Sequence, residues 1–180
     1  MMSVNEEKAS LRTRYRKERR ERYVEHDFLN LVEIPEIAAA KTIGSYFSIN
    51  DEPSTSALNH ELHQMGKVLV LPSIDGKDLL WHIWDGATIN LEPKIPEATG
   101  EIIDRSEIDV LLVPALRVDR NGYRLGQGGG YYDRELAKLR VWSCALVHPD
   151  EISSSDLPRE EFDIAVSAFA TPDLITRIKS

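Results

Sequence analysis

The segment that decides the fold runs from residue 108 to residue 147 and reads IDVLLVPALRVDRNGYRLGQGGGYYDRELAKLRVWSCALV. Residues 108–113 form a run that is apolar except for Asp109, which is typical of a strand buried on both faces of a sheet. A glycine cluster follows at residues 126–130, a helix is predicted over 131–139, and residues 141–147 form a second apolar run. A strand, a loop, a helix and another strand in this order predict an α/β fold with a parallel sheet.

Turn residues and hydrophobic patterning extend this alternation to the rest of the chain. Ser3 and Glu6 have the spacing of a capping box, which predicts a polar helix over residues 4–22. The other predicted elements are helices over 25–33, 53–65 and 172–179, strands over 42–49, 67–71, 79–84 and 164–170, and an extended segment over 85–105. No feature marks a boundary, so residues 1–180 are expected to form a single α/β domain with a mostly parallel sheet.

Charge is distributed unevenly along the chain of 180 residues. Its 22 basic and 30 acidic residues give a net charge of −8. Residues 1–22 hold eight basic and four acidic residues, a net charge of +4, so residues 23–180 carry −12. Because nucleic-acid backbones are bound by broad basic surfaces, this acidic body argues against a nucleic-acid-binding protein. The basic first helix is the segment whose charge suits a small anionic ligand.

Cysteine content and apolar runs restrict the cellular location. Cys144 is the only cysteine, which excludes an internal disulfide bond and a multi-cysteine zinc site. No apolar run approaches the roughly 18 residues of a membrane span. The basic start of the chain is not followed by the apolar core of a secretory signal. We therefore expect a cytoplasmic protein with no membrane partner.

Residues 124–134 carry the pattern that points most directly to chemistry. Four glycines within 126–130 allow backbone N–H groups to converge, and the N-terminus of the following helix adds partial positive charge. Together these features predict a phosphate-binding loop. A flexible linker is the alternative, but Tyr131 and Tyr132 favour an ordered loop. The loop matches neither the Walker motif nor the dinucleotide-binding motif, so the kind of nucleotide stays open.

Two acidic and two basic residues are candidates for a site beside this loop. Asp133 lies in the first turn of the predicted helix, where it either interacts with the helix dipole or binds Mg²⁺ beside phosphates. Asp163 precedes the last apolar strand, where a solvated acidic run is the more common explanation. Lys8 and Arg12 are four residues apart on the first predicted helix, so they share a face that could neutralise an anion.

A longer set of motifs surrounds the loop and continues along most of the chain. The set consists of Val113-Pro114, Gly122–Gly126, Gly128–Gly130, Tyr131-Tyr132-Asp133, Lys8–Arg12, Tyr46–Glu52 and Phe162-Asp163. In order and spacing these motifs resemble those of the 5-formyltetrahydrofolate cyclo-ligase family, also called methenyltetrahydrofolate synthetases. The resemblance implies a three-layer α/β/α sandwich with a mixed, mostly parallel sheet.

The resemblance also implies an ATP-dependent ligase of one-carbon metabolism. Such an enzyme converts 5-formyltetrahydrofolate, with or without a polyglutamate tail, to 5,10-methenyltetrahydrofolate, and it releases ADP and phosphate. The formyl oxygen attacks the γ-phosphate of ATP, N10 of the folate closes the ring, and phosphate leaves. This chemistry depends on positioning and charge neutralisation. Mg²⁺ is the implied cofactor, and we expect a monomer with no nucleic-acid partner.

Roles for individual residues follow from the matching positions. The resemblance implies catalytic roles for Lys8, Arg12 and Arg124. It implies ATP binding by Lys8, Ala9, Ser10, Leu11, Arg12, Arg124, Leu125, Gly126, Gln127, Gly128, Gly129, Gly130, Tyr131 and Tyr132. It implies folate binding by Arg12, Phe47, Glu52, Gln127, Gly128, Gly129, Gly130 and Tyr131. Asp133 and Asp163 are the implied Mg²⁺ ligands.

Two residues depart from the family pattern near the loop. Gln127 stands where the family usually has Arg or Lys, so one positive charge is missing. Arg117 lies in a stretch that the family usually fills with small or apolar residues, and we expect it to supply that charge. Gln127 also favours an alternative function, a non-catalytic relative that acts as a nucleotide-binding regulatory module. Finally, we expect the first helix to be mobile until ATP binds, because it has few apolar anchors.

Overall fold

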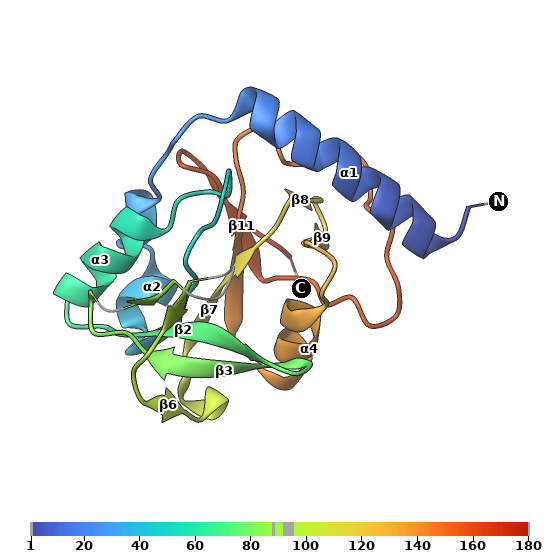
Figure 1. The fold of residues 1–180 in the computed structure, drawn as a ribbon. Coiled ribbons are helices and arrows are strands. Elements are labelled where there is room, and N and C mark those ends of the chain that lie inside the picture. Colours follow the sequence, from blue (N-terminus) through green and yellow to red (C-terminus); the bar gives the residue numbers. More distant parts are fainter. Residues whose placement is uncertain (1, 88, 92–95, 180) are drawn as a thin grey trace.

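The fold is an eight-stranded sheet with helices on both faces (Figure 1). The structure is a computed structural model that describes residues 2–87, 89–91 and 96–179. The helices are α1 (Val4–Arg22), α2 (Pro35–Ala39), α3 (Ser56–Gln64) and α4 (Tyr131–Lys138), with 3₁₀ turns η1 (Leu29–Leu31) and η2 (Arg105–Glu107). The strands are β1 (Thr42–Gly44), β2 (Val68–Asp75), β3 (Asp78–Ile83), β4 (Ile89–Asn90), β5 (Glu97–Ala98), β6 (Ile102–Ile103), β7 (Val110–Pro114), β8 (Arg117–Val118), β9 (Arg124–Leu125), β10 (Trp142–Leu146), β11 (Ala168–Ala170) and β12 (Ile175–Arg177).

The main sheet has the strand order β12-β11-β10-β7-β1-β2-β3-β6. Its five central strands, from β11 to β2, pair in parallel. The outer strands β12, β3 and β6 pair antiparallel. The prediction of an α/β fold with a mixed, mostly parallel sheet is therefore confirmed.

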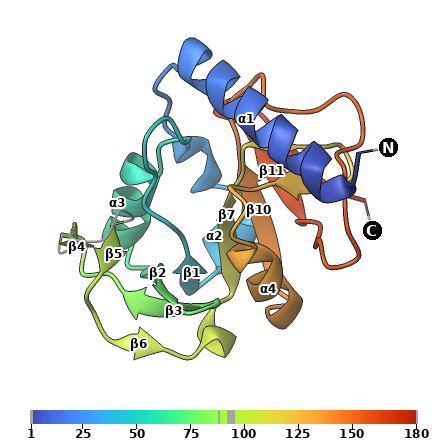
Figure 2. The same cartoon turned by 45° about the vertical axis from the view of Figure 1, so that its right-hand side comes forward.

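Hydrophobic side chains divide between the two faces of the sheet and produce three layers. On one face, Ile37 of α2 and Leu58 of α3 pack with strand residues such as Leu112. On the other face, Leu136 of α4 packs with Leu111. Neighbouring residues of a strand point to opposite faces, so the apolar run of β7 serves both cores. Figure 2 shows α4 separated from α2 and α3 by the central strands.

Local sequence signals placed several boundaries correctly. The Ser3 side chain accepts a hydrogen bond from the backbone N–H of Glu6, and the Glu6 carboxylate accepts one from the Ser3 N–H, so the capping box is confirmed. Gly66 adopts a φ of +81° just after α3, the left-handed conformation common at helix ends. Gly76, with φ +61°, turns the chain between β2 and β3 as predicted.

Four predicted elements are wrong in type or extent, and one of them is the strand over 164–170, which begins only at Ala168. The terminal helix over 172–179 is absent, and β12 pairs there with the edge of the sheet, because tertiary pairing overrides a weak helical preference. The helix over 25–33 is reduced to η1, and Pro35 begins α2, where its missing N–H is not needed. The strand over 42–49 ends at Gly44. The extended segment over 85–105 includes residues 88 and 92–95, which lie outside the described residues.

The direction of the connections reverses between the neighbouring strands β1 and β7. From β1 the chain passes through α3 to β2 on one side, whereas from β7 it passes through α4 to β10 on the other side. The loops that leave the carboxyl ends of β1 and β7 therefore diverge. Ligands of open α/β sheets bind at such a point. Within the described ranges, none of the helices has the length and apolar character that crossing a bilayer requires.

Helix α1 lies across this edge of the sheet and is fastened by a buried ion pair (Figure 1). Arg19 Nε and Nη2 lie 2.6 and 2.7 Å from the two carboxylate oxygens of Glu151, and the side chains are 4% and 6% exposed. Arg19 also donates to the Ala115 carbonyl, and Glu151 accepts from the His148 N–H. The anchors of α1 are thus polar, and the mobility of the helix before ATP binds stays a prediction.

We predict that Arg19→Met lowers the free energy of unfolding by about 3 kcal/mol or more, because it leaves the Glu151 carboxylate buried without its partner. Urea unfolding measures this loss, and amide exchange should rise throughout α1. Arg20→Met is the matched control, since Arg20 is exposed on the same helix. Equal stability of the two variants would show that the ion pair does not anchor the helix.

Candidate functional site

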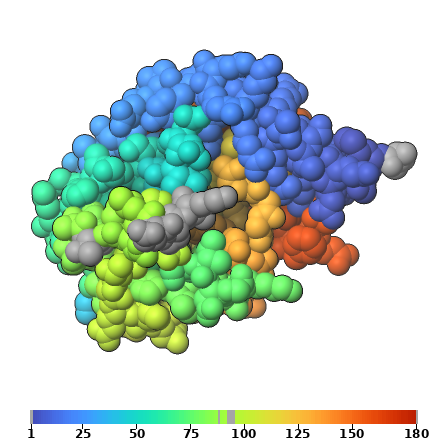
Figure 3. Space-filling view, viewed as in Figure 1, coloured from blue at the N-terminus to red at the C-terminus, as the bar shows by residue number. Residues whose placement is uncertain are grey.

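A cavity of about 460 Å³ lies at the carboxyl ends of β1 and β7. Its volume is within the range of small-molecule sites. Its walls come from α1, the segment after β1, the β2–β3 hairpin, the end of β7, the glycine loop with α4, and residues 160–163. In the space-filling view, the orange surface of the glycine loop and α4 is exposed between blue α1 and the green hairpin (Figure 3).

The glycine loop has a conformation that requires glycine at two positions. Gly128 has a φ of +110°, and Gly130, the N-cap of α4, has a φ of +67°. Residues other than glycine are strained when φ has such positive values. The Arg12 side chain fixes the start of the loop, because its Nε donates to the Gly126 carbonyl at 2.9 Å. The first turn of α4 thereby faces the cavity, as a phosphate site requires.

A lysine from α1 meets two acidic residues from the other end of the chain. Lys8 Nζ lies 2.5 Å from Asp163 Oδ2 and 3.1 Å from Glu160 Oε2. The Lys8 side chain is only 6% exposed. All three residues line the cavity. This contact brings the basic N-terminal segment and the late acidic segment to the same site.

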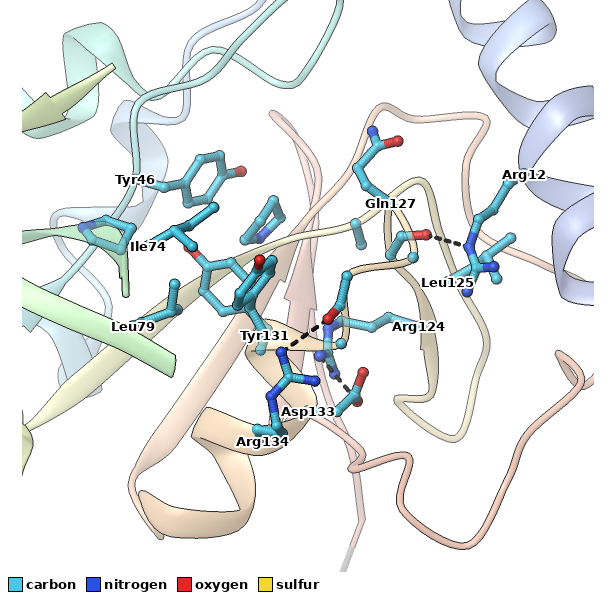
Figure 4. A pocket seen from close by; sticks show the side chains of 18 of the residues that line it. Arg12, Tyr46, Ile74, Leu79, Arg124, Leu125, Gln127, Tyr131, Asp133 and Arg134 are labelled. Atoms are coloured by element: carbon cyan, nitrogen blue, oxygen red, sulfur yellow. Dashed lines mark hydrogen bonds and ion pairs between the residues drawn. The ribbon is translucent and has the colours of Figure 1, made fainter. Parts of the chain in front are cut away.

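A buried arginine links Asp133 to the same acidic segment. Arg124 Nη2 lies 3.1 Å from Asp133 Oδ1, and Arg124 Nη1 donates to the Ile164 carbonyl (Figure 4). Asp133 Oδ1 also accepts from the Ile164 N–H, directly after Asp163. Burial lowers the pKa of Arg124 below its ordinary value, while the charges of Asp133 and Asp163 oppose that shift. Both aspartates therefore lie near one guanidinium.

The carboxylates of Asp133 and Asp163 fit a magnesium ion that a phosphate ligand helps to hold. Mg²⁺ is usually bound in proteins by one or two carboxylates together with phosphate oxygens and water. Over the residues that the structure describes, no group of three or more His, Cys, Asp or Glu residues could hold a metal ion. A metal at this place would thus depend on oxygens from its ligand.

The opposite end of the cavity is apolar and carries an acid. Phe47 packs edge-on against Trp84, with ring centroids 5.5 Å apart. Glu52 is only 9% exposed, and its Oε2 accepts from the Ile49 N–H at 3.0 Å. Burial raises the pKa of Glu52 above its ordinary value, and the Ile49 hydrogen bond and Arg19 oppose this. The hairpin closes this end with Pro72, Ile74 and Leu79.

Most residues that the sequence proposed for the site line this cavity. The residues brought together are Lys8, Arg12, Phe47, Glu52, Arg124, Leu125, Gly126, Gln127, Gly128, Gly129, Gly130, Tyr131, Tyr132, Asp133 and Asp163. Ala9, Ser10 and Leu11 do not line the cavity, and Ala9 and Ser10 are exposed. The sequence argument gave no role to several other lining residues, which include Pro72, Ile74, Leu79 and Glu160, and Tyr46 and Phe162 although both lie in the quoted motifs. The turn residues at 75–76 predicted the β2–β3 hairpin, but nothing in the sequence indicated that this hairpin covers the site.

The expectation that Arg117 compensates for Gln127 is wrong. Arg117 does not line the cavity, and its Nη2 lies 2.8 Å from Glu18 Oε2 while its guanidinium stacks on Tyr15. Arg16 is the residue beside Gln127. Its Nε donates to the Gln127 side-chain oxygen and its Nη2 to the Gln127 carbonyl, both at 2.9 Å.

This fold and this cavity define an α/β protein with a glycine loop between basic side chains and a pair of aspartates. Comparison with known proteins gives the family. The model of the 5-formyltetrahydrofolate cyclo-ligase family matches residues 4–172, so the chain belongs to this family.

Individual relatives agree with this membership. A 5-formyltetrahydrofolate cyclo-ligase from Mycolicibacterium smegmatis is 34% identical over 148 residues, which cover 74% of this chain and 75% of the relative. The Escherichia coli protein of the same name is 30% identical, covering 78% and 83%. The solved structure of 5,10-methenyltetrahydrofolate synthetase from Aquifex aeolicus superposes with a TM-score of 0.81 at 27% identity, covering 96% of this chain and 93% of that one.

We predict a pH-dependent gain in stability for Glu52→Gln. The folded-state pKa of Glu52 lies above its ordinary value of 4.5, so the folded protein keeps the Glu52 proton to a higher pH than the unfolded chain does. The free energy of unfolding of the wild type therefore falls as the pH rises from 4.5 through the folded-state pKa. Glutamine removes this loss and can still accept from the Ile49 N–H.

Urea unfolding at about pH 4 and about pH 8 should show that the free energy of unfolding of the variant increases relative to that of the wild type as the pH rises. Glu33→Gln, at an exposed glutamate, is the control and should show a smaller change. If the difference in free energy of unfolding between Glu52→Gln and the wild type is the same at both pH values, the prediction that burial raises the pKa of Glu52 is wrong.

Proposed function

We propose that this protein is an ATP- and Mg²⁺-dependent 5-formyltetrahydrofolate cyclo-ligase. In this reaction 5-formyltetrahydrofolate becomes 5,10-methenyltetrahydrofolate, and ATP becomes ADP and phosphate. The observation that carries the proposal is the contact of Lys8 with Asp163, 155 residues apart, beside a glycine loop held by Arg12. The pairing supports one assembled site built from all the family motifs.

The glycine-loop end of the cavity suits the phosphates of ATP. Backbone N–H groups at the start of α4 and the side chains of Lys8, Arg12 and Arg124 provide positive charge where the γ-phosphate is transferred. The protein supplies no covalent step in such a transfer, so positioning the formyl oxygen in line with the phosphate is its main task. Lys8 is held by carboxylates beforehand, which keeps its ammonium group in place.

Asp133 and Asp163 would hold Mg²⁺ together with phosphate oxygens. The ion would supply neutralising charge at the phosphates when bound. The apolar end suits the folate, with Phe47 against the face of the pterin and Glu52 at its polar edge. The polyglutamate preference, the monomeric state and the cytoplasmic location stay predictions.

Gln127 was the residue that favoured a non-catalytic binding module, and its contacts no longer support that alternative. Gln127 lacks a charge of its own, but the Arg16 guanidinium is bonded to both its side chain and its carbonyl. A positive charge is therefore present at this corner of the loop. No other described contact favours a binding module over a ligase.

We predict ATP-dependent formation of 5,10-methenyltetrahydrofolate by the purified protein, measured by its absorbance. EDTA should abolish the activity, and added Mg²⁺ should restore it. Asp133→Asn, which keeps the shape of the side chain, should lower kcat by about 100-fold or more, because metal-ion neutralisation contributes several kcal/mol to such reactions.

Asp173→Asn provides the matched control, since Asp173 is exposed and outside the cavity. Its activity should equal that of the wild type. Measurable Mg-ATP binding without product formation by the wild type would reject the ligase and support the binding module.

We also predict that Arg16→Met raises the KM for ATP by about two- to fivefold with little change in kcat, since an exposed charged contact is worth up to about 1 kcal/mol. Steady-state kinetics with varied ATP measures this effect. Arg20→Met removes an equal charge one turn further along α1 and should leave the KM for ATP unchanged. Equal effects of both variants would mean that only the overall charge of the helix matters.

A further inference from the structure

Tyr46 places an unpartnered hydroxyl group in the wall of the cavity. The residue follows the carboxyl end of β1 and is only 4% exposed. No described residue provides a hydrogen-bond partner for its hydroxyl. Nearly all buried hydroxyl groups in proteins have a partner, because losing the hydrogen bonds of water without replacement is unfavourable. Tyr46 therefore weakens the ligand-free fold, and a role in ligand binding explains why a tyrosine stands there.

The Tyr46 residue lines the cavity, and its hydroxyl oxygen is closed to solvent in the structure. Figure 4 shows the Tyr46 ring at the edge of the cavity with its oxygen turned toward the side where Gln127 and Tyr131 lie. Glu52 and Tyr132, which also line the cavity, act electrostatically on Tyr46, and so does Arg19. Burial raises the pKa of Tyr46 well above its ordinary value, so the phenol stays protonated and can donate.

The surroundings decide which group this donor can recognise. Lys8, Arg12 and Arg124 gather at the glycine-loop end, which is where an anion is stabilised. Tyr46 instead stands beside the Glu52 carboxyl group and the apolar side chains Phe47 and Ile74. A phosphate here would meet an acid, and Arg19, the cation whose charge acts on Tyr46 and Glu52, is already paired with Glu151. A flat, uncharged ring with a carbonyl oxygen would satisfy the phenol and bury its faces against apolar side chains.

We propose that the Tyr46 hydroxyl donates a hydrogen bond to a carbonyl oxygen on the pterin ring of the folate, while Glu52 accepts from a neighbouring ring N–H. A donor beside an acceptor matches the amide-like edge of such a ring, where a carbonyl adjoins an N–H. This assignment rests on the proposed function. It makes Tyr46 a specificity residue for the folate and gives it no part in phosphate transfer.

Tyr46→Phe is the decisive variant, because it deletes only the hydroxyl. Calorimetry without ATP should show the dissociation constant for 5-formyltetrahydrofolate rising about tenfold, the usual effect of leaving one buried polar group of a ligand unpaired. In steady-state assays the KM for the folate should rise, while kcat and the KM for ATP should stay within about twofold. The ligand-free melting temperature should stay equal or increase, since the variant removes an unsatisfied group.

A purely structural tyrosine gives the opposite pattern. A lower melting temperature with unchanged folate binding would overturn the proposal, and so would a rise in the KM for ATP alone. Tyr23→Phe is the control, since Tyr23 is 38% exposed and lies outside the cavity, and its folate affinity should equal that of the wild type.

The calorimetric experiment also separates this inference from the ligase itself. A wild type that binds the folate but forms no product would reject the proposed reaction, and weaker binding by Tyr46→Phe would still support the role of the hydroxyl. An active wild type with unchanged folate affinity in the variant would reject the role of Tyr46 alone.

Discussion

The ion pair between Arg19 and Glu151 holds together the parts of the chain on which the site depends. Both side chains are closed to solvent, so each charge is stabilised by the other, by the Ala115 carbonyl and by the His148 N–H. A buried pair is tolerated only when its remaining hydrogen-bonding groups are satisfied in this way. Ala115 follows β7 and Glu151 follows β10, so the pair fixes α1 on the edge of the sheet that contains the cavity.

Charge compensation explains how an acidic protein can offer an anion site. Without a ligand, the Lys8 ammonium pairs with Asp163 and the Arg124 guanidinium pairs with Asp133. In the proposed reaction, a phosphate ligand that arrives with a divalent cation would bring both signs of charge. The carboxylates would then bind the metal and the basic side chains the phosphates, so no buried charge would be left alone. The net charge of −12 outside the first 22 residues is therefore no obstacle.

The sequence predicted those features that short-range signals control. The capping box located α1, the glycines located the loop before α4, and the apolar runs identified the central parallel strands. It failed for residues 172–179, where a short segment completes the sheet edge and pairing with β11 decides its conformation. It also assigned the missing loop charge to Arg117 instead of Arg16. Arg117 is ten residues from Gln127 in sequence and Arg16 is 111 residues away, and only the position of α1 across the loop identifies Arg16 as the neighbour.

The order of the strands finally determines how the two ends of the cavity meet. Tyr46 and Glu52 belong to the segment that leaves β1, whereas the glycine loop lies between β7 and α4. These segments diverge along the sheet. A ligand held by the β1 segment can therefore face a ligand held by the glycine loop only above the carboxyl ends of β1 and β7. A neutral phenol at the β1 end does not compete with the phosphates for the basic side chains. It can orient an uncharged ring while those side chains remain with the anion, which is the separation that a transfer between two bound ligands requires.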